Sequence, residues 1–429
     1  MKYSAILVLL LAFPLVNAID KPNWSVGDNW DYAGNLQYSI SLNDEIMNFS
    51  VDGNMQISFT IHIKVVGTKI KEINGEPYAC YIVDMNSTTE GKGLAIIEIQ
   101  LPNQSQSYEV NVDIDLNVKA NGKTYLTTDE IAMVESDLIT DTNMKISIDA
   151  PGVPSWMLNI IGLSNKDVQL HNETVTTYDP PFDFMDFPIE KGEWTAESTV
   201  QYSTDGSMPM NYPINLTFRC VDLGKNAAEI VSDYIPFLGE ITIDFMGYPI
   251  PLMNFQNTTF IWSATAGMME RILNSASVDE QGFKVSTDLE INLLPGYTYT
   301  PNQNKAPKAK ITYTPSTLTT GIPISFNADA SDEDGNIIYY YWEFGDGTTS
   351  KRQNPSHTYT KAGTYQVKLV VIDNYGAKGE DIRTITVKGA GNGDGGNGNN
   401  GDGNNGTPGF EVLFALIAIT AIALRRRLR

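Results

Sequence analysis

The chain contains few of the residues from which most catalytic and metal centres are built. Its 429 residues include three histidines and two cysteines. The sequence has no His-Glu-x-x-His motif, no Gly-x-Ser-x-Gly motif and no phosphate-binding glycine loop. A serine or cysteine nucleophile therefore has no recognisable histidine base, and transition metals lack the His and Cys ligands that they favour. We predict that the protein is not an enzyme and carries no tightly bound cofactor.

One acidic stretch is the place where a catalytic pair of carboxylates would have to lie. It contains Asp179, Asp183, Asp186, Glu190 and Glu193. Glycoside hydrolases use two carboxylates, so this stretch keeps open the interpretation of a secreted hydrolase. Three prolines interrupt it, and we therefore favour a connecting loop between two β-layers.

Positive charge is also scarce. Lys and Arg number 29 against 51 Asp and Glu, which gives a formal net charge of −22. Four of the arginines close the chain, so the remainder is more acidic still. A surface of this sign repels nucleic acid, and we expect no nucleic-acid partner.

The two cysteines, Cys80 and Cys220, leave two interpretations open. In an oxidising exterior they can form a disulfide, although 139 residues separate them. They can equally remain two buried thiols in separate strands, because sequence does not give the distance that a disulfide requires.

No apolar run reaches the roughly 20 residues that a membrane-spanning helix needs. Near the N-terminus, Lys2 precedes an apolar run at 5–16, and Val16-Asn17-Ala18 offers small residues for a peptidase. This order predicts a secretory signal peptide over residues 1–18, cleaved after Ala18, and therefore an exported protein.

The C-terminus has three parts in a fixed order. Pro408-Gly409-Phe410 is followed by an apolar segment at 412–424, expected to be helical, and then by a cluster of arginines that ends the chain. This layout resembles the PGF-CTERM sorting signal of archaeal surface proteins. The resemblance implies cleavage near the tripeptide by an archaeosortase and transfer to a membrane lipid; a plain tail anchor is the alternative. The arginines favour the cytoplasmic side, which places the rest of the chain outside the cell, tethered at its C-terminus.

Residues 19–296 predict a large β-rich region that resembles no family known to us. Apolar and polar residues alternate at 55–65 and 108–118, as in strands with one solvated face. We expect curved antiparallel sheets. Helix is favoured only after Ser155, a capping residue, and at 268–274, where the apolar spacing is helical.

A loose internal repeat is one interpretation of the same region. A segment at 26–32 that contains Trp30 recurs loosely at 190–194 around Trp194. Duplication would give halves at 19–178 and 179–296; the alternative is that two unrelated strands each begin with an aromatic residue. Residues 297–306 are polar and aperiodic and predict a linker. Residues 389–407 contain almost only Gly, Asn and Asp, which predicts a flexible tether of about 25 Å.

Residues 307–388 carry three motifs within a β-sandwich pattern. They are Trp-x-Phe-Gly-Asp-Gly at 342–347, His-x-Tyr at 357–359 and Gly-x-Tyr-x-Val-x-Leu-x-Val at 363–371. The residues of the first two are Trp342, Phe344, Gly345, Asp346, Gly347, His357 and Tyr359. With these motifs the segment closely resembles the PKD domain.

The resemblance implies an immunoglobulin-like sandwich with Trp342 as its core anchor. Domains of this family serve as spacers and in adhesion at cell surfaces and have no catalytic residues of their own. Some relatives hold calcium, and here Asp332 and Asp334 offer oxygen ligands for weak binding; a solvated turn is the alternative. We interpret His357 as structural.

Eight Asn-x-Ser/Thr sequons occur in the chain. Asn86, Asn103 and Asn172 are expected to carry glycans in turn-like surroundings. The sequence thus predicts an all-β surface glycoprotein with a structural, adhesive or recognition role toward an unknown surface protein or glycan. The alternative is an extracytoplasmic binding protein for an apolar or lipid-like ligand, because residues 235–238 and 245–253 are strongly apolar.

Overall fold

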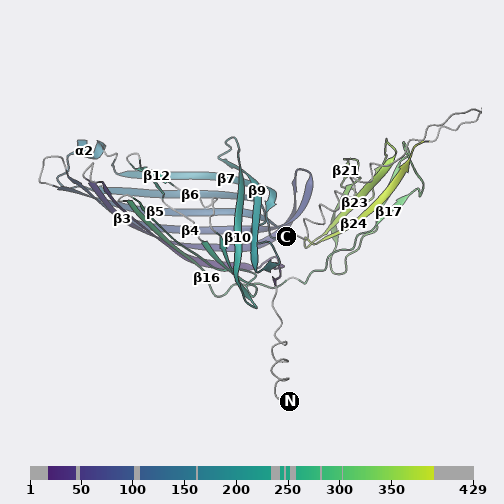
Figure 1. Cartoon of the computed structure of the whole chain (residues 1–429), viewed down its shortest axis with the longest axis horizontal. Coiled ribbons are helices and arrows are strands. Elements are labelled where there is room, and N and C mark those ends of the chain that lie inside the picture. Colours follow the sequence, from purple (N-terminus) through teal and green to yellow (C-terminus); the bar gives the residue numbers. More distant parts are fainter. Residues whose placement is uncertain are drawn as a thin grey trace, which may run out of the picture. The chain divides into compact units, whose positions relative to one another are not determined.

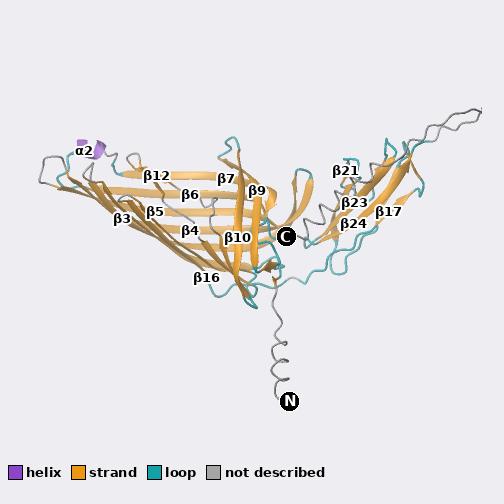
Figure 2. Cartoon of the chain, in the orientation of Figure 1, coloured by secondary structure: helices purple, strands orange, loops and turns teal. Residues whose placement is uncertain are grey.

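The computed structural model describes residues 18–44, 49–100, 107–160, 163–232, 242–245, 248–251, 258–280, 283–301 and 303–390. Strands dominate it, and the all-β fold is confirmed (Figure 2). Among the described residues there is one short helix, α2 (Ser155–Ile160). It begins at Ser155, the residue expected to cap it. The sorting signal and its apolar segment lie outside the described residues. Among the described residues, no helix is long and apolar enough to cross a membrane.

The N-terminal region folds into one closed antiparallel barrel. In chain order its described strands are β2 (Asn29–Asp44), β3 (Phe49–Ile73), β4 (Glu76–Gln100), β5 (Ser107–Thr127), β6 (Met133–Asp149), β7 (Lys166–Phe182), β9 (Gly192–Thr204), β10 (Met210–Leu223), β11 (Ala227–Ser232), β14 (Thr258–Ser263), β15 (Met268–Glu280) and β16 (Phe283–Leu293). Strand β9 pairs with β7 and with β10, and β16 pairs with β2, which completes the ring. The long strands β3 to β6 lie side by side in Figure 1. Residues 19–178 and 179–296 therefore contribute to the same barrel; their duplication remains a prediction.

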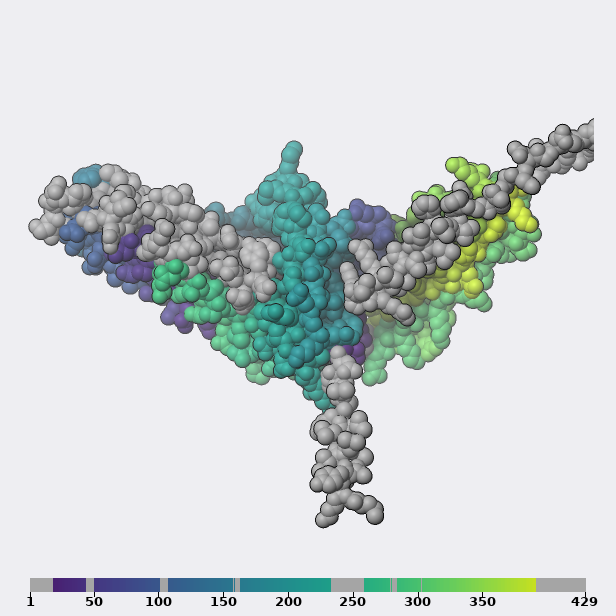
Figure 3. All heavy atoms as spheres, in the orientation of Figure 1, coloured from purple at the N-terminus to yellow at the C-terminus, as the bar shows by residue number. Residues whose placement is uncertain are grey.

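Side-chain alternation separates the two faces of the barrel. On β2, Trp30, Tyr32 and Leu36 are buried, whereas Asp31 and Asn35 between them are exposed. Successive residues of a strand point to opposite faces, so the apolar set fills the interior and the polar set faces outward. The hairpin turn between β9 and β10 projects from the teal part of the surface in Figure 3.

Two tryptophans pack against each other in the barrel interior. The rings of Trp24 and Trp30 lie 5.4 Å apart between centroids. Their indole N–H groups donate to the carbonyl oxygens of Gly267 (2.8 Å) and Ala266 (2.7 Å). Both carbonyls belong to the turn between β14 and β15, so these hydrogen bonds fix that turn against the start of the barrel.

The helix expected at 268–274 is wrong. These residues belong to β15, which pairs with β14 on one side and β16 on the other. Two ladders of backbone hydrogen bonds override the helical spacing of the apolar residues, because local propensity is a weak preference. A short strand, β1 (Ala18–Ile19), pairs with β8 (Ile189–Glu190), and the hairpin of β12 (Thr242–Phe245) and β13 (Tyr248–Pro251) forms a separate small sheet.

The two cysteines are separate buried thiols, and the disulfide is not formed. Cys80 packs with Tyr125 and Val134, whereas Cys220 belongs to a different apolar cluster. Burial raises the pKa of the Cys80 thiol to about 12, which keeps it protonated and unreactive.

The first part of the expected linker is bound to the barrel. Asn29 and Thr298 exchange backbone hydrogen bonds of 2.9 and 3.0 Å. The ring of Tyr299 packs against Trp30 at 6.3 Å between centroids. The packing of Tyr299 and the backbone hydrogen bonds of Thr298 explain why this polar segment is ordered.

The C-terminal region is a β-sandwich. One sheet holds β17 (Ile311–Thr314), β19 (Ile324–Ala328) and β22 (Ser356–His357). The other holds β18 (Leu318–Thr319), β24 (Lys378–Lys388), β23 (Gly363–Asp373), β20 (Ile337–Glu343) and β21 (Thr349–Ser350). Trp342 is fully buried and packs against Phe326 at 5.7 Å, as the core anchor was expected to do.

Candidate functional site: a polar groove on the barrel

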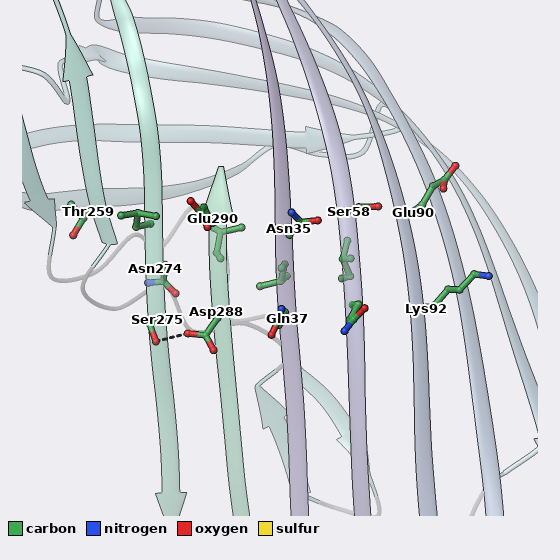
Figure 4. Close-up of a pocket in the computed structure, with 15 residues that line it drawn as sticks. Asn35, Gln37, Ser58, Glu90, Lys92, Thr259, Asn274, Ser275, Asp288 and Glu290 are labelled. Atoms are coloured by element: carbon green, nitrogen blue, oxygen red, sulfur yellow. Dashed lines mark hydrogen bonds between the residues drawn. The ribbon is translucent and has the colours of Figure 1, made fainter. Parts of the chain in front are cut away.

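A groove of about 840 Å³ crosses the outward face of the barrel. Its lining comes from six neighbouring strands in the spatial order β14, β15, β16, β2, β3 and β4. Asn35, Gln37, Gln56 and Ser58 lie at its centre, as Figure 4 shows for the labelled side chains. We call this feature the polar groove.

The strand register brings these residues together. Gln37 of β2 lies opposite Gln56 of β3 and Asp288 of β16. Asn35 lies opposite Ser58 in the same way. All of them occupy the exposed set of alternating positions, so residues far apart in sequence share one face. In the sequence, these residues are visible only as polar residues at every second position of a strand. This pattern predicts a solvent-facing side of the sheet, but it does not predict a binding site.

The central amides have no partners within the protein. Among the described residues, nothing accepts from or donates to the side chains of Asn35, Gln37 and Gln56. A comparable pair elsewhere on the outward face behaves differently, since Gln201 of β9 donates to Asn211 of β10 at 3.3 Å. Each free amide offers two N–H donors and one carbonyl acceptor to a ligand.

The polar rows beside the groove are paired internally. The hydroxyls of Thr60 and Thr88 lie 2.8 Å apart, and those of Ser39 and Ser286 lie 2.7 Å apart. A ring nitrogen of His62 contacts Asp31 at 2.5 Å. Exposed amides elsewhere on this face, such as Asn54 and Asn143, also lack a partner among the described residues, so free amides alone do not mark the groove.

Carboxylates on one flank of the groove are held in place. Asp288 accepts the hydroxyl of Ser275 at 2.6 Å. Glu290 accepts from Asn292 at 3.1 Å and from Arg271 at 2.8 Å, and these hydrogen bonds lower the pKa of Glu290.

On the other flank, Glu90 and Lys92 have no ion-pair partner in the part of the chain that the structure describes. The lining contains no histidine, cysteine or aromatic residue. Among the described residues there is no group of three or more His, Cys, Asp or Glu that can hold a metal. The groove can therefore bind a polar ligand through many hydrogen bonds.

The acidic stretch lies at the connection between β7 and β8, and Asp183 and Asp186 are both in that connection. The Oδ1 atom of Asp183 accepts the backbone N–H of Asp186 at 3.1 Å. Burial raises the pKa of Asp183 to about 7, and the neighbouring Glu130 adds to this effect. The carboxylate is thus a half-buried acid within a connecting segment, as the prolines predicted for that part of the stretch.

The structure brings Asp332 and Asp334, the residues expected to bind calcium weakly, only partly together. Asp332 accepts the backbone N–H groups of Asp334 and Gly335 at 2.9 and 3.0 Å. Its Oδ2 atom is buried without a hydrogen-bond partner among the described residues. Partial burial opposes ionisation, but these backbone hydrogen bonds outweigh it and lower the pKa of Asp332. Asp334 instead accepts the backbone N–H of Lys305 at 3.2 Å.

Sequence reasoning missed the partner of Asp332. Asp373 is fully buried, lies within hydrogen-bonding reach of Asp332 and accepts from the side chain of Asn304 at 2.6 Å. These two carboxylates, with the Asn304 amide beside them, fit a hard cation such as calcium. They come from segments far apart in sequence, and no local motif joins them. Calcium binding therefore remains a prediction, now centred on Asp332 and Asp373.

The motif residues of the sandwich contact one another. His357 contacts Asp346 at 2.8 Å between Nε2 and Oδ2, and its ring stacks on Phe344 at 4.2 Å. The hydroxyl of Tyr359 donates to the carbonyl of Phe344 at 2.8 Å, and Trp342 donates to that of Arg352 at 2.9 Å. These contacts give His357 a packing role, which agrees with its structural interpretation.

The prediction that the sequons lie in turn-like surroundings is wrong for Asn86 and Asn172. Asn86 lies within β4, exposed on the outward face, and Asn172 lies within β7, half-buried on the face of the buried Tyr178. Strand residues can also satisfy a sequon, because the motif prescribes sequence and not turn geometry. Asn103 lies outside the described residues.

Comparison with known proteins identifies two parts of the chain. A family model for the PKD domain matches residues 304–387, and one for the PGF-CTERM motif matches residues 407–428. The chain therefore contains a PKD domain of immunoglobulin-like fold. The C-terminal motif is a sorting and anchoring signal, so the protein is located at the cell surface, and it implies processing by an archaeosortase.

Relatives in curated collections match through the same kind of domain. Collagenase ColQ1 of Bacillus cereus is 33% identical over 142 residues, and collagenase ColA of Bacillus cereus is 46% identical over 66 residues. The matches span 30% and 15% of this chain but only 15% and 7% of those proteins. They cover PKD-like regions, which are not catalytic. The PKD1 domain of Vibrio anguillarum Epp is 36% identical and matches 20% of this chain and 100% of its own, with a TM-score of 0.19.

Proposed function

We propose that the protein is a surface recognition protein whose barrel binds a polar partner in the polar groove. The PKD domain and the tether present the barrel at the cell surface. The protein has no catalytic activity of its own, and Asn86, exposed on the outward face, carries a glycan.

One observation carries this proposal, namely the unpaired amides at the centre of the groove. The side chains of Asn35, Gln37 and Gln56 are exposed to solvent and make no hydrogen bond to the described residues, and the strand register gathers them in one groove. A ligand can replace that solvent without breaking any contact within the protein. The groove volume of about 840 Å³ lies within the range typical of ligand sites.

The tether supports the same role. Residues 389–407 are rich in glycine and asparagine, a composition that predicts a flexible tether with a reach of about 25 Å. Copies held in one membrane can then engage a repetitive partner together, which strengthens weak contacts without new ones.

One observation bears on the alternative of a ligand inside the barrel, although it favours a polar group over an apolar ligand. The hydroxyls of Tyr38 and Thr287, opposite each other on β2 and β16, are buried without partners among the described residues. The packing nearby is tight, however: a Cβ added to Gly34 would meet the ring of Phe59 at 2.3 Å, and one added to Gly91 would meet Met55 at 2.8 Å. This packing favours the groove over an interior site.

The groove is tested by blocking it in the full-length protein. A variant with Gln37→Arg and Gln56→Arg fills the centre of the groove with two long side chains. The matched control carries Gln201→Arg and Asn211→Arg, which change an exposed amide pair by the same charge outside the groove. We expect binding to a cell-envelope preparation to fall by at least about tenfold in the first variant and to stay within about twofold in the control. Equal effects of both pairs would contradict the proposal.

The tether is tested by the mass of the mature protein. We propose that the chain ends near Pro408 and carries a membrane lipid in place of residues 412–424. The processed N-terminus is expected at Ile19. Intact-mass analysis of protein extracted from membranes should show both ends; a mass that includes Arg429 would support a permanent tail anchor instead.

A further inference from the structure

The direction of the polar groove limits the shape of its ligand. Its lining residues come from six adjacent strands, so the groove crosses the strands and does not follow one of them. Five inter-strand steps of about 4.8 Å give it a length of about 24 Å. A compact small molecule would fill only part of that length, whereas a linear chain molecule can use all of it.

Hydrogen-bonding groups are presented at each step along this length. The sequence of outward residues runs from Ser275 through Asp288, Gln37 and Gln56 to Lys92, each opposite the next in the strand register. Amides and hydroxyls both donate and accept, carboxylates accept and the ammonium group donates. A hydroxyl group can both donate and accept a hydrogen bond. A ligand that carries hydroxyl groups along its length therefore matches a row that contains both donors and acceptors.

The charge of the groove and the pairing of its backbone argue against two other ligand classes. Carboxylates of Asp288, Glu290 and Glu90 outnumber the ammonium of Lys92, so the groove does not attract a polyanion. Four of the fifteen lining residues are apolar, and three of these, Leu36, Ile57 and Leu289, alternate with the outward-facing residues of the same strands. A peptide cannot add as a further strand here, because the strand N–H and C=O groups beneath the groove are used in the ladders.

We propose that the polar groove binds a linear, neutral oligosaccharide that lies across the strands. The proposal deepens the proposed function and rests on it. Gln37 and Gln56 contact the hydroxyls of the central sugar units, and the flanking carboxylates and Lys92 contact units on either side. Since aromatic stacking is absent, each site binds weakly, and strong attachment requires several tethered copies.

The test measures the binding of defined probes to the full-length protein in detergent. The probes are β-1,4-linked hexasaccharides of glucose, mannose and N-acetylglucosamine, their disaccharides, a hyaluronan hexasaccharide and hexalysine. We expect at least one neutral hexasaccharide to bind about tenfold or more tightly than its disaccharide, because the longer chain uses more of the groove. Neither hyaluronan nor hexalysine should bind comparably.

Variants assign the binding to the groove. Gln37→Ala with Gln56→Ala should weaken the binding of that hexasaccharide roughly tenfold to a hundredfold. Gln201→Ala with Asn211→Ala, the matched exposed pair, should leave it unchanged. Because both pairs are exposed, loss of folding is not expected, and circular dichroism checks it.

The outcomes separate the two proposals. If no neutral hexasaccharide binds, or if the disaccharide binds as well as the hexasaccharide, the assignment to a linear glycan is wrong. The proposed function survives that result when envelope binding still depends on Gln37 and Gln56. If hexalysine alone binds, the partner is cationic and the glycan assignment is also wrong. If envelope binding ignores the groove variants, the proposed function itself fails.

Discussion

The sandwich and the barrel use their polar side chains in opposite ways. In the sandwich, the residues of the recognisable motifs contact one another: His357 contacts Asp346, and Tyr359 donates to the backbone of Phe344. In the barrel, Gln37 and Gln56 lie opposite each other and form no such bond. The region whose sequence is easiest to identify is therefore stabilised by its motif. The region without a recognised motif presents side-chain donors and acceptors that no described residue occupies.

The largest expected difference between the two regions comes from the core of the sandwich. Replacing Trp342 by Ala leaves a cavity among Phe326 and Phe344 and should destabilise the sandwich by about 3–5 kcal/mol. Calorimetry should then show a lower melting temperature for the sandwich transition and an unchanged barrel transition. The control, Trp156→Ala, removes a side chain that is 56% exposed, and should change stability by less than about 0.5 kcal/mol. Equal shifts of both transitions would show that the two regions unfold together.

The pH dependence of stability should also differ in sign between the barrel and the sandwich. Burial raises the pKa of Asp183 to about 7, above its unfolded value, so the folded barrel binds this proton more tightly. The resulting stability is present below about pH 4 and is lost as the pH rises toward 7. Asp183→Asn keeps the acceptor for the Asp186 N–H and removes the titration. At pH 8 we expect this variant to be more stable than the parent by about 2–4 kcal/mol, with no difference at pH 4.

The sandwich should respond in the opposite direction. Partial burial of Asp346 raises its pKa, but hydrogen bonds from Thr348 and His357 outweigh this effect and lower it. A lowered folded-state pKa gives stability that is present above the unfolded value and lost as the pH falls. Melting curves between pH 3 and pH 8 therefore test the contrast; a barrel whose stability rises from pH 4 to pH 7 would contradict it.

The smallest expected effect is that of calcium on the sandwich. With the millimolar affinity typical of extracellular sites, 10 mM calcium should stabilise the sandwich by about 1 kcal/mol. Asp332→Asn should remove this effect, because it removes one of the two carboxylate ligands. The barrel transition in the same experiment is the internal control. A shift that persists in the variant would place the calcium elsewhere.

Local patterns in the sequence predicted the fold class but not the groove. The motif around Trp342 can be recognised because its residues lie close together in the sequence. Alternation of apolar and polar residues on β3 identified an outward face that contains Gln56 and Ser58. The groove, in contrast, joins residues from 35 to 290 through strand register. Register depends on which strands pair and where bulges fall, and alternation does not specify either. The pairing of Asp332 with Asp373 was missed for the same reason, and residues 268–274 show how a ladder overrides local spacing.

The double pairing of β9 has a consequence for a protein displayed beside many copies of itself. An open sheet ends in a strand whose N–H and C=O groups can template the addition of another chain. Here β9 pairs with both β7 and β10, and the ring of described barrel strands has no terminal strand. Two barrels that collide on a crowded membrane therefore meet through side chains alone. The closed ring resists fibre growth, and contacts between neighbouring molecules are left to their solvent-facing residues.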